Sequence, residues 1–161
     1  WRYHRPYLTK WMCLARMVNY IPTLQEIRES TTDWSPKLIT EVLDERIDRG
    51  EKTWSSAYMI TTCGKKMNKV DYVVGHVCSK VPEVSECLSL AEAYRLLRKV
   101  DGLGSFLAAQ ILADLKNTPG AMLFNATDWD TWSAPGPGSL RGLSYYYQRA
   151  STATVYQQAL Q

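Results

Sequence analysis

The chain has 161 residues, of which 45% are hydrophobic and 22% are charged. These are ordinary values for a folded globular protein, and this length can bury a core within one domain, so we predict a single domain over residues 1–161. No stretch approaches about 18 consecutive apolar residues, so we expect no membrane span. The 19 basic and 16 acidic residues leave a net charge of +3, too small an excess to indicate nucleic-acid binding by itself.

Regular spacing of apolar residues predicts helices in the first third of the chain. A stripe of them runs from Tyr7 to Tyr20. Thr23 and Glu26 have the spacing of a capping box, which predicts a second helix starting at Thr23. Ser35 followed by proline indicates the start of a third helix, which we expect to end at Gly50.

Helical signals continue through the middle of the chain. We predict a short buried helix over 54–62 and another over 68–79, although the valines of the second segment also suit a strand. A basic cluster of Lys65, Lys66 and Lys69 lies between them, and it either meets phosphate or forms a solvated face. Ser89 opens a further capping box and helix.

The four cysteines do not have the spacing of a metal site. Cys13, Cys63, Cys78 and Cys87 contain no C-x-x-C pair, and the two histidines are far apart in sequence. We therefore expect no metal and no other cofactor. Cys13 and Cys78 have apolar neighbours, as free buried thiols do, which favours a reducing, intracellular setting.

Residues 90–116 predict two helices joined by a tight turn, a helix-hairpin-helix. Gly102 and Gly104 permit a turn that a Cβ would obstruct, and Leu103 between them can fill the angle between the helices. The second helix then begins at Ser105, with its first amides unpaired. The unpaired amides and the dipole of this second helix together predict a site that binds a DNA phosphate. The alternative is an ordinary helix-turn-helix, because two glycines at this spacing are a weak signal.

Residues 117–138 are rich in Pro, Gly, Asn and Asp, which predicts a long functional loop. At its end Gly136 and Gly138 lead into a helix that we expect to begin at Ser139, and Arg141 adds a guanidinium. Free amides and a bidentate fork make this a second anion-site candidate, with a plain turn as the alternative. The tail, 150–161, is expected to be helical or frayed.

The 90–116 segment and the loop that follows it resemble the helix-hairpin-helix DNA glycosylase superfamily. This resemblance implies an all-α, glycosylase-like helical domain. Asp128 follows Gly104 at the separation at which that superfamily carries a catalytic Asp, and Asp130 is close behind. Phe106 stands where bifunctional members carry a nucleophilic Lys, which argues against lyase chemistry.

The pattern from Asp128 through Trp132 to the 136–143 run also resembles the α-glutamyl/putrescinyl thymine pyrophosphorylase families of phage thymine hypermodification. Blocks at 14–19, 23–24 and 52–58 are similar to them too. A very similar helical domain accompanies 5-hydroxymethyluracil DNA kinases, and the residues do not separate the two families. Kinase chemistry within this chain is not expected, because Gly64 lacks the surroundings of a P-loop.

The resemblance implies a transferase that flips out a modified thymine in double-stranded DNA and lets an amine or amino acid displace its pyrophosphate. Asp128 would be the base that deprotonates the amine, with Asp130 second, although a helix-cap or salt-bridge carboxylate is the alternative for each. The implied catalytic residues are Asp128, Arg141 and Asp130. The implied DNA-binding residues are Gly102, Leu103, Gly104 and Ser105. The implied pyrophosphate and substrate residues are Gly136, Gly138, Ser139, Arg16, Asn19, Tyr58 and Trp132.

Two other functions stay open. One is a non-catalytic DNA-binding domain with a fused or partner kinase, and the other is a monofunctional glycosylase in which Asp128 activates water. The enzyme hypothesis predicts that Asp128, Arg141 and Arg16 converge on one pocket, whereas the binding-domain hypothesis predicts no such pocket. In each case the expected place is the cytoplasm or nucleoid of a phage-infected bacterium.

Overall fold

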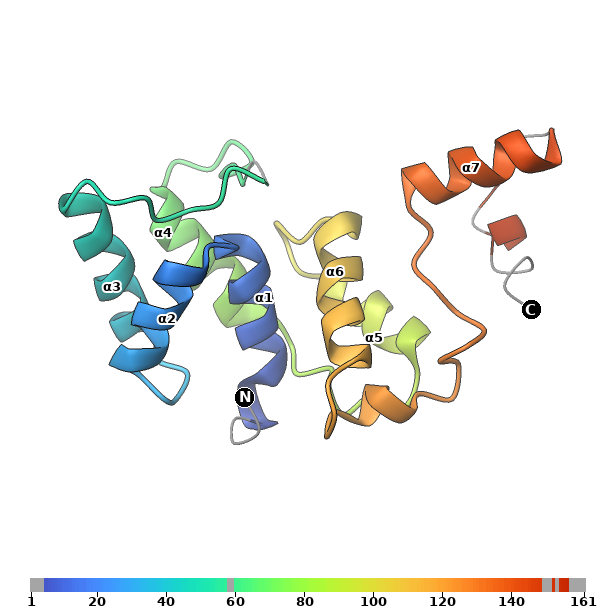
Figure 1. The fold of residues 1–161 in the computed structure, drawn as a ribbon, viewed down its shortest axis with the longest axis horizontal. Helices are drawn as coiled ribbons and strands as arrows, with labels where there is room; N and C mark the ends of the chain where they lie inside the picture. Colours follow the sequence, from blue (N-terminus) through green and yellow to red (C-terminus); the bar gives the residue numbers. More distant parts are fainter. Residues whose placement is uncertain (1–4, 58–59, 149–151, 153, 157–161) are drawn as a thin grey trace.

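The computed structural model describes residues 5–57, 60–148, 152 and 154–156, and every helix or strand element within that part is helical. Figure 1 shows the helices in sequence colours. The predicted all-α class is therefore confirmed. No helix in the described ranges has both the length and the apolar character needed to cross a bilayer.

The first and third helices follow their sequence signals closely. Helix α1 (Leu8–Val18) follows a 3-10 turn, η1 (Arg5–Tyr7), and ends where Asn19 adopts a left-handed φ of 45°. Helix α3 (Pro36–Asp48) begins as predicted, since the Ser35 hydroxyl accepts a hydrogen bond from the Leu38 amide at 3.4 Å. Gly50, at φ 70°, then turns the chain away.

Two predictions in this half of the chain are wrong. Helix α2 (Ile21–Ser30) begins before Thr23, with a proline in its first turn, so Thr23 is not the N-cap. Its buried hydroxyl instead donates to the carbonyl oxygen of Thr53 at 2.9 Å. The predicted helix over 54–62 is also absent from the described residues there, which form an irregular segment.

Residues 69–80 form one continuous helical segment, which excludes the strand alternative. It comprises α4 (Lys69–Asp71), the π-helical η2 (Tyr72–Val77) and the 3-10 turn η3 (Cys78–Lys80). The Asn68 side chain caps it by accepting from the Asp71 amide at 2.7 Å. The valines of this segment are buried, so their spacing reflects a buried helix and not a sheet.

Helices α5 (Leu90–Leu97) and α6 (Ser105–Lys116) are joined by the turn that contains Gly102 and Gly104, and we call this pair the α5–α6 hairpin. In Figure 1 α6 stands between α1 and α5, at the centre of the molecule. The core lies along α1, the 69–80 segment and α6, and one apolar face of α6 is buried in it. These buried residues of α6 are Ala108, Ile111, Leu112 and Leu115.

The C-terminal part is attached more loosely. A 3-10 turn, η4 (Met122–Asn125), interrupts the long loop, and α7 (Pro137–Tyr147) begins slightly before the predicted Ser139. None of the residues of α7, all of which are described, is buried. Figure 1 shows α7 apart from the other helices. Of the predicted tail, 150–161, the described part includes a short helical turn at 154–156.

Candidate nucleic-acid interface

The hairpin presents the N-terminus of α6 to solvent. Gly104 and Ser105 are exposed, and no described side chain caps this helix end. A Cβ added to Gly104 would meet no described atom within 4 Å. The first hydrogen bond of the helix joins the Ala108 amide to the Gly104 carbonyl at 3.0 Å. The positive end of the α6 dipole therefore lies at an open surface, as an anion site requires.

The other two predicted hairpin residues shape the turn from inside. Leu103 is buried, and its carbonyl oxygen accepts a hydrogen bond from the Arg98 guanidinium at 3.3 Å. Gly102 has a φ of 90°, and a Cβ there would lie 2.5 Å from the Tyr72 hydroxyl oxygen. Both the backbone conformation and the close approach of Tyr72 thus require glycine. The DNA contacts of all four hairpin residues stay predictions.

Basic side chains from two distant segments reach the hairpin turn through Asp101. The Asp101 carboxylate lies 2.8 Å from Nζ of Lys65 and 3.0 Å from Nε2 of His76. The Lys80 ammonium lies 3.4 Å from the other nitrogen of His76. A hydrogen bond from Lys65 contributes most to lowering the pKa of Asp101, and a hydrogen bond from His76 contributes next.

The effect of this cluster is to neutralise the acid of the turn. Asp101 would otherwise repel a phosphate at the tip of α6. Because the Asp101 carboxylate is paired, the exposed Arg98 and Lys99 keep the turn basic. We call Lys65, His76, Lys80, Arg98 and Lys99 the basic rim. The sequence pointed to Lys65 but not to His76 or Lys80, whose position depends on a contact between distant segments.

Tyr72 supports the turn from beneath. Its ring stacks on His76, with centroids 5.5 Å apart, and its hydroxyl donates to Sγ of Cys63 at 3.2 Å. Burial, above all, raises the pKa of Tyr72 to about 12. The phenol therefore stays protonated and keeps its donor role. The π-helical turn that carries Tyr72 and His76 holds both rings against the hairpin.

Asp128, the predicted base, lies at the start of α5. One carboxylate oxygen accepts from the Leu90 amide at 2.7 Å, and the other accepts from the Ala91 amide at 3.0 Å. The Ser89 hydroxyl accepts from the next amide, Glu92, at 3.2 Å, as its capping-box pattern predicts. This geometry favours the helix-cap alternative, because both oxygens of Asp128 already satisfy unpaired helix amides. Asp130 is exposed.

The tryptophans of the same loop pack it onto the hairpin helices. The Trp129 indole donates to the Lys116 carbonyl at 3.4 Å, and the Lys116 ammonium lies 3.8 Å above the indole ring. Trp132 is half-buried beside Tyr94, with ring centroids 5.3 Å apart. The predicted stacking of Trp132 on a flipped base is untested, and its present neighbour is Tyr94.

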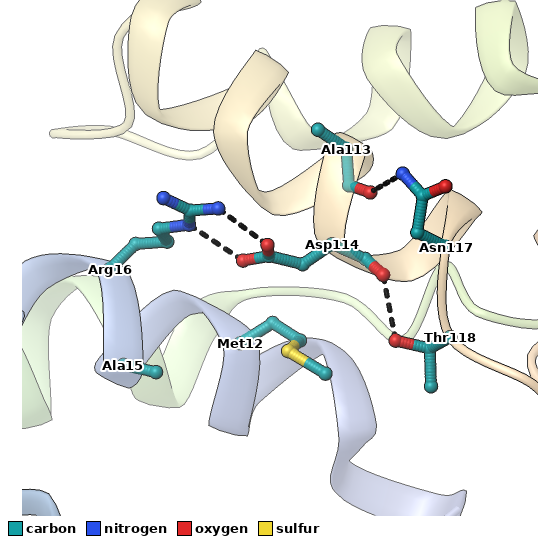
Figure 2. Close-up of a pocket in the computed structure, with 7 residues that line it drawn as sticks. All are labelled: Met12, Ala15, Arg16, Ala113, Asp114, Asn117 and Thr118. Carbon is teal, nitrogen blue, oxygen red and sulfur yellow. Dashed lines mark hydrogen bonds and ion pairs between the residues drawn. The ribbon is translucent and has the colours of Figure 1, made fainter.

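Arg16 lies at a hollow between α1 and α6, shown in Figure 2. Its guanidinium forms a bidentate pair with Asp114, at 2.6 and 2.5 Å. The hollow has a volume of about 560 Å³ and is open to solvent. Its lining residues are Met12, Ala15, Arg16, Ala113, Asp114, Asn117 and Thr118. The other predicted residue of α1, Asn19, is the C-cap of the helix.

Three residues that the enzyme hypothesis places in one pocket, Asp128, Arg141 and Arg16, lie on three different elements. Asp128 caps α5, Arg16 pairs with Asp114 on α6, and Arg141 is exposed on α7. Figure 1 shows α1 on one side of the α5–α6 hairpin and α7 on the other. The predicted substrate residue Tyr58 lies outside the described residues. These placements fit the binding-domain hypothesis better than the enzyme hypothesis, and the individual catalytic roles stay predictions.

An all-helical fold with an exposed, basic hairpin defines a candidate nucleic-acid-binding domain. The chain matches the family model described as "5-hmdU DNA kinase, helical domain" over residues 9–161, and it belongs to this family. This is the second of the two similar families that the sequence left open, and the match does not extend to the thymine pyrophosphorylases. No curated protein and no solved structure matched the chain.

Proposed function

We propose that this chain is the DNA-binding part of a 5-hmdU DNA kinase, acting with a fused or partner kinase. The α5–α6 hairpin is a helix-hairpin-helix of the glycosylase-like kind, and it binds the phosphate backbone of the duplex that carries the modified base. The observation that carries this proposal is the exposed N-terminus of α6 at Gly104 and Ser105, with the basic rim beside it.

Each part of this surface suits a phosphate. Backbone amides and the helix dipole attract an anion without reading sequence, and the Lys and Arg side chains add charge that releases counterions from DNA. Contacts of this kind hold a duplex in register but do not select a base. The proposed division of labour therefore leaves recognition of the modified base to the kinase.

A single substitution tests the proposal without threatening the fold. Ser105→Glu places a carboxylate in the first turn of α6, where the helix dipole stabilises it, but where it repels a phosphate. We expect affinity for a duplex oligonucleotide at low salt, measured by fluorescence anisotropy, to fall about tenfold. Gln25→Glu is the matched control, because it adds the same charge at an exposed position of α2.

The proposal also fixes the salt dependence. Wild-type affinity must fall steeply as salt rises, with a shallower slope for Ser105→Glu, because a phosphate contact is lost. Equal binding by Ser105→Glu and Gln25→Glu, or binding that does not change with salt, would refute the hairpin as the DNA-binding surface.

The amine transfer implied by the thymine pyrophosphorylase resemblance is a separate proposal. In it, Arg141 holds the leaving pyrophosphate while a carboxylate of the 128–130 loop deprotonates the amine. Its test is nucleoside mass spectrometry after incubation of pyrophosphorylated DNA with a panel of amines. Arg141→Ala is the suitable variant, because Arg141 is exposed, whereas any change at Asp128 also removes a helix cap. No new aminomethyl nucleoside with the wild-type chain would dismiss this activity, while abasic sites would indicate the glycosylase.

A further inference from the structure

Three sulfur atoms from two separate segments meet in the core. Cys13 and Met17 lie one turn apart on α1, and Cys78 begins η3. The distance between the two thiol sulfurs is 3.5 Å, and the Met17 sulfur lies 3.9 Å from Cys13 and 3.7 Å from Cys78. Cys13 and Cys78 have no exposed surface, and Met17 is 2% exposed. We call these three side chains the sulfur triangle.

The sulfur triangle has nearly the dimensions of a three-coordinate metal site. With metal–sulfur bonds of about 2.3 Å, an ion at the centre of three sulfurs would hold them about 4.0 Å apart. The observed separations of 3.5, 3.7 and 3.9 Å are only slightly shorter. Small shifts of the three sulfur atoms would therefore admit the ion.

The donor atoms select the kind of ion. Two thiols and a thioether are soft ligands, which favour Cu(I), and by the same chemistry Ag(I), over hard ions that require oxygen. Zinc ordinarily takes four tetrahedral ligands, and the described residues contain no group of three or more His, Cys, Asp or Glu side chains that could hold a metal. We propose that the sulfur triangle of Cys13, Met17 and Cys78 binds one monovalent, soft metal ion such as Cu(I).

The exchange balances in atoms and charge. In the metal-free chain the Cys78 thiol donates a hydrogen bond to Sγ of Cys13, and burial raises the pKa of that thiol well above its ordinary value. On binding, one thiol releases its proton to the buffer and its sulfur forms a bond to the ion, while the other two sulfurs donate lone pairs. One cation enters for each proton that leaves, so the core gains no net charge and no oxidant is needed.

Complete burial determines how the ion enters. The sulfur triangle opens only when α1 separates from η3, during folding or a local opening. Because the three sulfurs meet only in the folded chain, the ion binds the folded state in preference to the unfolded chain. It must therefore raise the thermal midpoint of unfolding. The site is distinct from the basic rim, since no residue of the sulfur triangle belongs to that rim.

The test uses the full chain with Cys63→Ser and Cys87→Ser, which removes the thiols outside the sulfur triangle. The protein is refolded without oxygen in the presence of Cu(I) held by a competing chelator. Native mass spectrometry is expected to show one copper per chain with one proton lost, and X-ray absorption is expected to show sulfur neighbours alone. Copper that disappears with Cys63 and Cys87, or that has nitrogen or oxygen neighbours, would overturn the proposal.

A matched pair of methionine variants locates the ion. In the same background Met17→Leu keeps the volume of the side chain but removes the third sulfur, so Cu(I) affinity is expected to fall at least tenfold. Met12→Leu changes a half-buried methionine of the same helix and is expected to leave the affinity unchanged. Equal affinities for the two variants would remove Met17 from the site. Duplex binding by the Met17→Leu and Met12→Leu variants is expected to equal that of the shared Cys63→Ser, Cys87→Ser background, so this outcome is separate from that of the proposed function.

Discussion

The sequence predicts anion sites at two helix N-termini, those of α6 and α7, and the two differ in the structure. At α6 the exposed Gly104 has no capping side chain among the described residues, and the helix behind it is packed into the core. At α7 the Ser139 hydroxyl accepts from the Gly136 amide at 3.0 Å and donates to its carbonyl at 2.9 Å, and none of the residues of this helix is fully buried. A helix start suits a phosphate best when its amides are unsatisfied and its position is fixed. The start of α6 has the more fixed position, because α6 packs into the core whereas no residue of α7 is buried.

The largest expected effect breaks the fixed position of the α6 turn. Gly102→Ala puts a Cβ at a φ of 90° and 2.5 Å from the Tyr72 hydroxyl oxygen, so we expect the free energy of unfolding to fall by about 3 kcal/mol. Gly138→Ala at α7 has open space and an ordinary φ, and it should change stability by less than about 1 kcal/mol. Urea denaturation measures both, and equal losses would show that the hairpin turn is not under this constraint.

The next effect concerns the helix that precedes the turn. Asp128→Ala leaves the Leu90 and Ala91 amides of α5 without their acceptor, which should cost about 2 kcal/mol of stability. Asp130→Ala, at an exposed position of the same loop, is expected to stay within about 0.5 kcal/mol of wild type. If both variants are equally stable in urea, Asp128 is not a structural cap and its catalytic role regains weight.

A charge reversal compares the two helix starts as DNA sites. Lys99→Glu, in the basic rim, is expected to weaken duplex binding about tenfold, whereas Arg141→Glu on α7 should weaken it less than about twofold. Both side chains are exposed, so neither change should affect folding. Fluorescence anisotropy at low salt gives the comparison, and the opposite order would move the interface to α7.

The smallest effect is a pH dependence from the turn itself. Lys65 and His76 lower the pKa of Asp101 from its ordinary value of 3.8, so the carboxylate adds stability above that value and loses it as the pH falls through its folded-state pKa. Below about pH 4 the wild type should therefore lose stability more steeply than Asp101→Asn. Urea midpoints across this range give the two slopes. Parallel curves would mean that Asp101 is not paired in solution.

The sequence predicted what depends on neighbouring residues. Ser35, Ser89 and Gly102 act through their own backbone or the next turn, so the α3 start, the α5 cap and the hairpin turn all follow from local patterns. The buried valines of 69–80 left a choice between helix and strand, because a fully buried segment satisfies either period. Tertiary packing selects the helix over the strand.

The sequence failed where a side chain finds a distant partner. Thr23 has the pattern of a cap, yet its hydroxyl bonds to the Thr53 carbonyl. For Asp128 the sequence left a catalytic base and a helix cap open, and its oxygens reach the amides of α5, while the catalytic role stays a prediction. Asp101 gathers Lys65 and His76 only after folding. No local pattern shows such contacts, and in each case the missing information was the identity of the hydrogen-bond partner.

The backbone amides themselves give the most direct test. In a nitrogen–proton NMR titration with a duplex oligonucleotide, the amide signals of Gly104 and Ser105 are expected to shift, and added salt should reverse the shift. Those of Gly138 and Ser139 should stay in place. Movement of the α7 signals with unchanged α6 signals would contradict the assignment of the DNA backbone to the hairpin.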